Sequence, residues 1–101
     1  MSFKPTVEMA NNAKRGLKMR EESTPSNRGG TEVGLARARQ FSNREGVSLE
    51  TVMRTYQFLT RHRKNYKPNQ NTPGTQAYLM WGGLPGLTWA VRILRSEGVI
   101  K

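Results

Sequence analysis

Residues 47–62, VSLETVMRTYQFLTRH, carry the best-marked helix start of the chain. Ser48 is the expected N-cap, because its hydroxyl can accept a hydrogen bond from a backbone amide of the first turn. Val47 and Val52 stand at the two positions of a hydrophobic staple, which fixes the angle at which a chain enters a helix. Apolar residues then recur at the spacing of one helix face, at Leu49, Val52, Tyr56 and Leu59. The stretch therefore predicts an amphipathic helix that begins at Leu49.

The side of this helix away from the apolar face is basic. This side of the helix carries Arg54, Gln57, Arg61 and Lys64. Arg63 and Lys67 lie nearby. Guanidinium and ammonium groups bind phosphates, and Gln or Arg side chains can also read base edges. Alternatively, these residues form an ordinary solvated helix face that binds no ligand. The pattern is compatible with either interpretation. No aromatic residue is expected on this side, so a stacking platform for single strands is not predicted.

Four further helices are expected on either side of this one. They span residues 7–22, 32–41, 76–81 and 85–96. Thr6 and Thr31 are the expected N-caps of the first two. Gly82 and Gly83 can adopt the left-handed conformation that ends a helix, so they are expected to separate the last two.

Three polar stretches are expected outside the helices. Residues 1–6 read as an extended arm, because Pro5 disfavours helical backbone at Lys4. Residues 23–30 and 66–75 are rich in Pro, Gly, Ser and Asn, which is typical of loops. Such stretches bury little apolar surface, and ordering each residue costs about 1–2 kcal/mol. We therefore expect these stretches to need a partner for their ordering.

Together these patterns predict an all-α fold, a small compact bundle of about four to five short helices with an extended N-terminal arm and polar loops. The chain of 101 residues is expected to form the arm, residues 1–6, and a single helical domain, residues 7–101. The expected inner face of the first helix consists of Val7, Ala10, Ala13 and Leu17. The large residues expected in the core include Trp81, Trp89, Tyr56 and Leu59.

The strongest compositional signal is charge. The chain has 17 Lys and Arg residues against 7 Asp and Glu residues, for a formal net charge of +10. A small domain needs a net charge of only about 2–8 for solubility, and no carboxylate occurs between Glu50 and Glu97. A domain with this excess of positive charge attracts polyanions, of which nucleic acid is the first candidate and acidic protein surfaces are the second.

No catalytic constellation is expected. The chain has no cysteine, which excludes disulfides, thiol chemistry and cysteine-based zinc sites. His62 is the only histidine, and the cations on both sides of it disfavour a metal ion. No apolar run approaches the ~18 residues that a membrane span needs. We therefore expect a binding protein and not an enzyme, without cofactor, metal, small-molecule substrate or membrane contact.

Six fragments, in order along the chain, carry a family resemblance. They are KRGLKMR at 14–20, GTEVGLARAR at 30–39, LETVMR at 49–54, FLTRH at 58–62, MWGG at 80–83 and GLTWA at 86–90. The series resembles a small domain of tailed bacteriophages and prophages, notably those of cyanobacteria, which occurs alone or beside head-morphogenesis proteins. The chain departs from the family pattern at residues 63–67, which are more basic, and at residues 72–75, which replace a Gly-Pro-Ser-Lys-like segment. The resemblance implies a phage origin and a link to phage heads.

Two functions follow from charge and resemblance. In the first, the protein is a virion-associated structural protein (minor capsid, cement or vertex-associated), present in the host cytoplasm during assembly. It would bind the capsid or other virion proteins through its basic face and its arms, whose anchor candidates are Phe3, Pro5, Tyr66 and Pro68. In the second, it is a phage nucleic-acid-binding protein, and the helix around residues 49–64 contacts the phosphate backbone of DNA or RNA. The side chains expected to contact nucleic acid or an acidic surface are Arg37, Arg44, Arg54, Arg61, Arg63, Lys64 and Lys67.

Overall fold

A computed structural model describes all residues, 1–101, and confirms the all-α prediction. Five α-helices follow one another, and no β-strand is present. The α-helices are α1 (Val7–Glu22), α2 (Glu32–Ser42), α3 (Leu49–Arg61), α4 (Pro73–Met80) and α5 (Gly83–Ser96). Two short 3-10 helices, η1 (Pro25–Asn27) and η2 (Arg63–Asn65), lie in the loops after α1 and α3.

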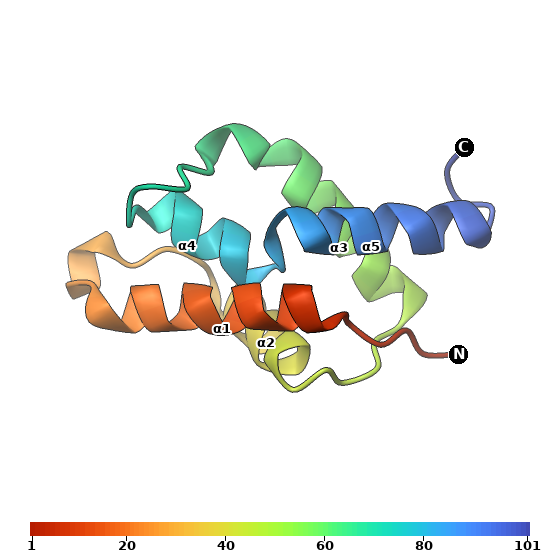
Figure 1. Cartoon of the computed structure of the whole chain (residues 1–101), viewed down its shortest axis with the longest axis horizontal. Coiled ribbons are helices and arrows are strands. Elements are labelled where there is room, and N and C mark those ends of the chain that lie inside the picture. Colours follow the sequence, from red (N-terminus) through yellow and green to blue (C-terminus); the bar gives the residue numbers. More distant parts are fainter.

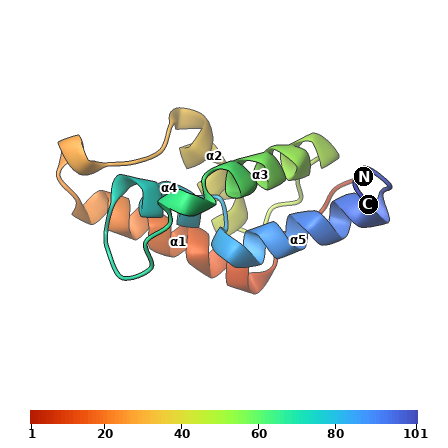
Figure 2. The ribbon, with the colours of Figure 1, turned by 90° about the horizontal axis from the view of Figure 1, so that it is seen from above.

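The helices form a flattened bundle with extents of 41 × 26 × 21 Å. Its radius of gyration, 12.7 Å, matches the ~13 Å of a compact domain of this length. α1 and α5 run roughly along the long axis, and α3 crosses α5 (Figure 1). Both chain ends lie at the same end of the molecule, as Figure 2 also shows. α1 packs chiefly against α4 and α2, whereas α3 packs chiefly against α5.

Side-chain caps start the first three α-helices where the sequence predicts them. Hydrogen bonds of 3.2, 3.1 and 3.3 Å run from the amides of Met9, Gly34 and Thr51 to the hydroxyls of Thr6, Thr31 and Ser48. Each cap satisfies a backbone amide that has no partner within its helix, and such a bond is worth about 1 kcal/mol.

α4 begins three residues earlier than the sequence analysis predicts, at Pro73 instead of Gln76. Thr72 is its N-cap, and its hydroxyl accepts a 3.1 Å hydrogen bond from Thr75 N. The prediction of a loop up to Thr75 is wrong because Thr and Pro serve equally in turns and at helix starts. The helix ends as expected, since Gly82 has a φ of +104°.

α1 and α4 come close together at a glycine. A Cβ atom on Gly16 would lie 2.7 Å from Met80 N and 2.8 Å from Gln76 O. Because Gly16 has no side chain, α1 and α4 can pack this closely. This packing offsets the ~1 kcal/mol by which Gly weakens a helix. Met9 is fully buried on the same helix, whereas Val7 is 50% exposed, so the predicted inner face is wrong at Val7. The other predicted residues of that face are buried or half-buried, namely Ala10, Ala13 and Leu17.

Aromatic rings fill the core next to α3 and α5. Phe41 meets both tryptophans edge to face, with its centroid 6.5 Å from that of Trp81 and 6.0 Å from that of Trp89. The two tryptophans are 7% and 6% exposed, and Leu59 is fully buried. Tyr56 is half-buried and packs against the edge of the cluster. Aromatic pairs of this kind add about 0.5–1.5 kcal/mol to the effect of burial alone.

Residues 1–6 are held along the helical body. Phe3 exchanges two backbone hydrogen bonds with Val47, of 2.8 and 2.9 Å. The indole Nε1 of Trp89 donates to Lys4 O at 2.9 Å, and Pro5 is fully buried. The arm therefore contributes to the core of its own chain.

One buried amide side chain joins the two polar loops. Gln76 Oε1 accepts from Gly29 N at 2.8 Å. Its Nε2 donates to Ser23 Oγ at 2.9 Å and to Asn71 Oδ1 at 2.8 Å. Gln76 is fully buried, so water does not compete for these bonds. These bonds tie both loops to the helical body of their own chain.

Candidate nucleic-acid interface

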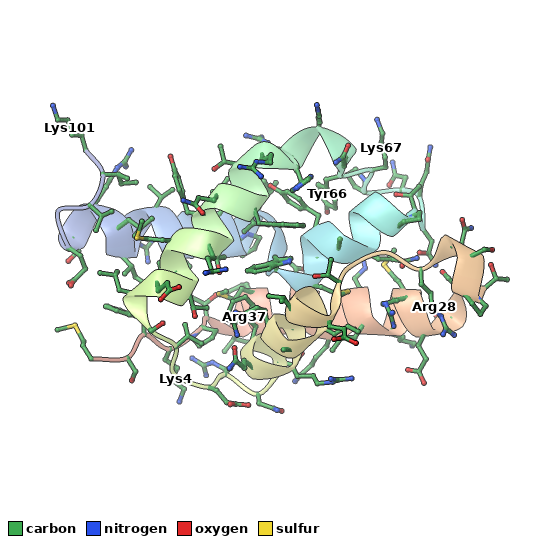
Figure 3. The ribbon with its side chains drawn as sticks, turned by 180° about the vertical axis from the view of Figure 1, so that it is seen from behind. Lys4, Arg28, Arg37, Tyr66, Lys67 and Lys101 are labelled. Atoms are coloured by element: carbon green, nitrogen blue, oxygen red, sulfur yellow. The ribbon has the colours of Figure 1, made fainter.

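Some of the basic side chains hold the fold together. Arg20 Nε donates to Gly29 O at 2.9 Å, and Arg28 Nε donates to Arg20 O and Ser23 O at 3.1 Å. Arg28 belongs to the loop after α1, and its side chain folds back on the end of that helix (Figure 3). These bonds hold both side chains against the backbone of their own chain, and neither arginine lines the hollows described below.

Arg37 and Arg44, two of the predicted contact residues, also have partners within the chain. Arg44 has a φ of +52° just after α2, at the position that commonly takes a left-handed residue, and its Nε donates to Pro5 O at 2.9 Å. Arg37 is half-buried and donates to Gln40 Oε1 at 3.0 Å, while its buried Nε has no partner. Neither arginine lines the hollows described below.

The other five predicted contact residues are exposed. They follow one another from the middle of α3, through η2, into the next loop, as Arg54, Arg61, Arg63, Lys64 and Lys67. Lys67 points outward from the ribbon (Figure 3). The one ion pair of the structure joins Arg54 to Glu50 at 3.0 Å, and exposed pairs of this kind are worth little. The remaining four cations have no carboxylate partner.

Three hollows that share lining residues connect four of these cations, all except Arg63, into one feature, which we call the basic groove. The first hollow, of about 190 Å³, is lined by residues of α2 and α3 and by the end of α4. The second, of about 370 Å³, shares Phe58 and His62 with the first. The third, of about 580 Å³, shares Asn65 and Gly74 with the second. No Asp or Glu lines the groove, and its cations are Arg54, Arg61, Lys64 and Lys67.

Aromatic rings line the first hollow together with the cations. The rings of Phe58 and Trp81 stack, with centroids 4.9 Å apart and an interplanar angle of 18°. The ring of Phe58 also contacts that of His62, at a centroid distance of 4.5 Å. The prediction that the basic side of this helix has no aromatic residue is therefore wrong. Phe58 and His62 are one helical turn apart, so their contact could be predicted from the sequence. Trp81 follows α4, and helix periodicity does not predict that it lies beside Phe58.

Two helices begin at the groove. Thr31, the N-cap of α2, lines the second hollow, and Thr72, the N-cap of α4, lines the third. A helix N-terminus acts as about half a positive charge. Glu32 in the first turn of α2 offsets this charge, whereas the first turn of α4 has no acidic residue. α4 therefore adds to the positive potential of the lysine end of the groove.

The four capsid-anchor candidates differ in their freedom to reach a partner. Pro5 is buried, and Phe3 is half-buried and paired with Val47. Tyr66 is half-buried and stacks on the buried ring of Tyr78, with centroids 5.1 Å apart. Pro68 is exposed. Only Pro68 can therefore enter a partner's groove without loosening contacts within the chain.

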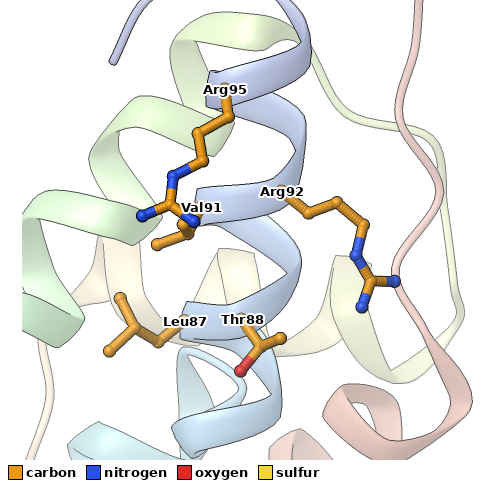
Figure 4. Close-up of a pocket in the computed structure, with 5 residues that line it drawn as sticks. All are labelled: Leu87, Thr88, Val91, Arg92 and Arg95. Carbon is orange, nitrogen blue, oxygen red and sulfur yellow. The ribbon is translucent and has the colours of Figure 1, made fainter. Parts of the chain in front are cut away.

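A further hollow, of about 420 Å³, lies on α5. All of its lining residues belong to that helix, namely Leu87, Thr88, Val91, Arg92 and Arg95. The side chains of Arg92 and Arg95 point away from each other (Figure 4). Arg95 Nε also donates to Lys101 O at 3.1 Å. The hollow is thus one exposed helix face with divergent cations, and we assign no site to it.

The chain shows no metal site, no membrane-spanning helix and no match to known proteins. No three His, Asp or Glu side chains come together as a group that could hold a metal ion. None of the helices is long and apolar enough to span a membrane. Comparison of the chain with family models, with curated proteins and with solved structures found no match.

Proposed function

We propose that the protein binds nucleic acid and holds its phosphate backbone in the basic groove. The observation that carries the proposal is the composition of the groove, which four cations and no carboxylate line. Lys and Arg side chains that neutralise phosphates release the counterions condensed on nucleic acid, and this release supplies most of the sequence-independent affinity.

The distribution of the cations favours a long polyanion over a single anion. Arg54 and Arg61 line the first hollow, whereas Lys64 and Lys67 line the third. The positive charge therefore lies at both ends of the groove, and no Lys or Arg lines the hollow between them. A backbone with regularly spaced phosphates can pair with all of these side chains at once, whereas one small anion reaches only one or two of them.

Two variants that remove equal charge test this proposal. The groove variant carries Arg61→Gln, Lys64→Gln and Lys67→Gln, all at exposed positions. The matched control carries three substitutions at exposed positions of α1, namely Lys14→Gln, Arg15→Gln and Lys18→Gln. Binding of a labelled oligonucleotide of about 20 nucleotides is measured by fluorescence anisotropy at low salt.

The groove variant should lose roughly tenfold or more in affinity, and the control should lose clearly less, although both change the net charge equally. Equal losses in the two variants would mean that the overall charge, and not the groove, attracts nucleic acid. Circular dichroism of both variants checks that the helices remain intact.

A second candidate function is attachment to a phage particle. It is supported by the family resemblance and by one structural observation, the exposure of every residue of the loop from Lys67 to Asn71, which includes Pro68. Figure 2 shows this loop extending beyond the helices between η2 and α4. In this candidate, the loop and the basic groove contact an acidic surface of the capsid or of another virion protein.

Mass spectrometry of purified particles tests the second candidate. The chain should be present in the virion, and deletion of residues 68–70 should lower its copy number. Its absence from the particles contradicts the attachment proposal and leaves the nucleic-acid proposal in place.

A further inference from the structure

The first hollow has features that a phosphate backbone alone does not require. Its lining includes the stacked rings of Phe58 and Trp81 and the adjacent ring of His62. Val33 of α2 also lines it and is 51% exposed, and Gln57 of α3 adds an amide. An apolar and aromatic lining with one amide suits a flat ring that carries hydrogen-bonding groups on its edge.

We propose that the first hollow takes an unpaired base of single-stranded nucleic acid, which stacks on the aromatic rings while the adjoining phosphates lie against the cations of the basic groove. This inference rests on the proposed function and names its ligand more closely. Base–aromatic stacking tolerates any sequence, because every base has a π face. Arg61, which has no carboxylate partner, and Arg54, which pairs with Glu50, line the same hollow, so a phosphate next to the inserted base finds a cation.

The accessibility of the rings indicates where the base stacks. Trp81 is 7% exposed and serves as the inner support of the stack, whereas Phe58 and His62 are half-buried. Asn65 Nδ2 donates a 3.2 Å hydrogen bond to His62 Nδ1, which orients the imidazole ring. Phe58 contacts both Trp81 and His62, so His62 is the outer ring of the three and the one that an incoming base meets.

The hollow discriminates between single strands and duplexes. Bases in a duplex are covered on both faces, and they reach a pocket only after extrusion from the stack, which costs pairing and stacking energy. A single strand already offers unpaired bases. The same groove should therefore hold a single strand more tightly than a duplex under conditions in which both supply phosphates.

An abasic strand separates stacking from charge. Anisotropy is measured with the full chain and three probes of equal length, oligo(dT), an abasic oligodeoxynucleotide with the same number of phosphates, and a duplex. Oligo(dT) should bind roughly 10-fold or more tightly than the abasic strand, which corresponds to one stacked base. His62→Ala should remove most of this preference, and His62→Phe should retain it. Tryptophan fluorescence should respond to oligo(dT) and not to the abasic strand.

Each other result overturns a different part of the account. Equal affinity for oligo(dT) and the abasic strand overturns base stacking and leaves the proposed function intact. Tighter binding of the duplex also overturns base stacking, and it would mean that the groove contacts only the nucleic-acid backbone. If polyglutamate of matched charge binds as tightly as oligo(dT), an acidic protein is the better partner. If no probe binds at low salt, the proposed function itself fails.

Discussion

The amide nitrogen of Gly29 donates a 2.8 Å hydrogen bond to Oε1 of Gln76, which lies 47 residues further along the chain. Through its other amide atom, Gln76 also holds Ser23 and Asn71. One side chain thus fixes both polar loops to α4. This arrangement ties parts of both polar loops to the helical body of their own chain.

Gln76→Leu should destabilise the protein by about 1–3 kcal/mol, because it leaves the buried Gly29 amide without an acceptor. The free energy of unfolding in urea measures the loss. Hydrogen exchange of the Gly29 amide should accelerate at the same time. Gln70→Leu, the same substitution in an exposed part of the loop, is the control and should change stability by less than about 0.5 kcal/mol. Similar stability of both variants would contradict the role of Gln76.

Local sequence signals predicted the helices well and their packing less well. Thr6, Thr31 and Ser48 were identifiable as caps because capping involves residues three positions apart. The role of Gln76 was not identifiable, since its partners are distant in the sequence. The start of α4 was missed because its residues also match a turn.

The same distinction applies to the candidate site. The exposed cations of α3 and η2 follow from helix spacing and composition. The stack of Phe58 on Trp81 does not, because it needs Trp81, the residue after α4, to lie against α3. Arg37 and Arg44 fit the basic pattern equally well in sequence, and only the fold shows that they bond within the chain.

Gly16→Ala should destabilise the protein by about 1–3 kcal/mol, although Ala is the better helix former by about 1 kcal/mol. The added Cβ would lie 2.7 and 2.8 Å from backbone atoms of α4, so the two helices must separate. Thermal unfolding followed by circular dichroism measures the effect. Asn11→Ala, at an exposed position of the same helix, should be neutral or slightly stabilising. A stabilised Gly16→Ala variant would show that α1 and α4 are not this close.

Trp81→Ala should cost about 3–5 kcal/mol, a large part of the ~5–15 kcal/mol that stabilises a typical domain. The indole is 7% exposed and contacts the rings of Phe41 and Phe58, which both lose packing. Urea unfolding gives the magnitude. Val33→Ala, on the exposed wall of the same hollow, should cost far less. If the two substitutions cost the same, Trp81 does not support the aromatic stack.

The stability of the protein should fall at alkaline pH because of Tyr78. Burial raises the pKa of its phenol, and the nearby Arg63 and Tyr66 have smaller lowering and raising effects. Below the ordinary pKa of about 10, the phenol is protonated in both states and its contribution is complete. As pH rises through the higher pKa of the folded state, the unfolded chain ionises first and this contribution is lost.

Tyr78→Phe measures that contribution. The variant loses the 3.0 Å hydrogen bond from the phenol to Leu59 O, which should cost about 1 kcal/mol at neutral pH. Its free energy of unfolding should then fall less steeply than that of the wild type above pH ~10. Parallel curves for the two proteins would show that Tyr78 does not cause the alkaline loss.

The salt dependence of nucleic-acid binding tests the central claim most directly. For a single strand, each neutralised phosphate contributes about −0.7 to the slope of log K against log salt concentration. Arg61, Lys64 and Lys67 each supply one contact in this account, so the variant with all three replaced by Gln should have a slope flatter by about two. The α1 control variant should keep the wild-type slope. An unchanged slope in the groove variant, or no binding of the wild type at low salt, would contradict the assignment of the basic groove as the nucleic-acid interface.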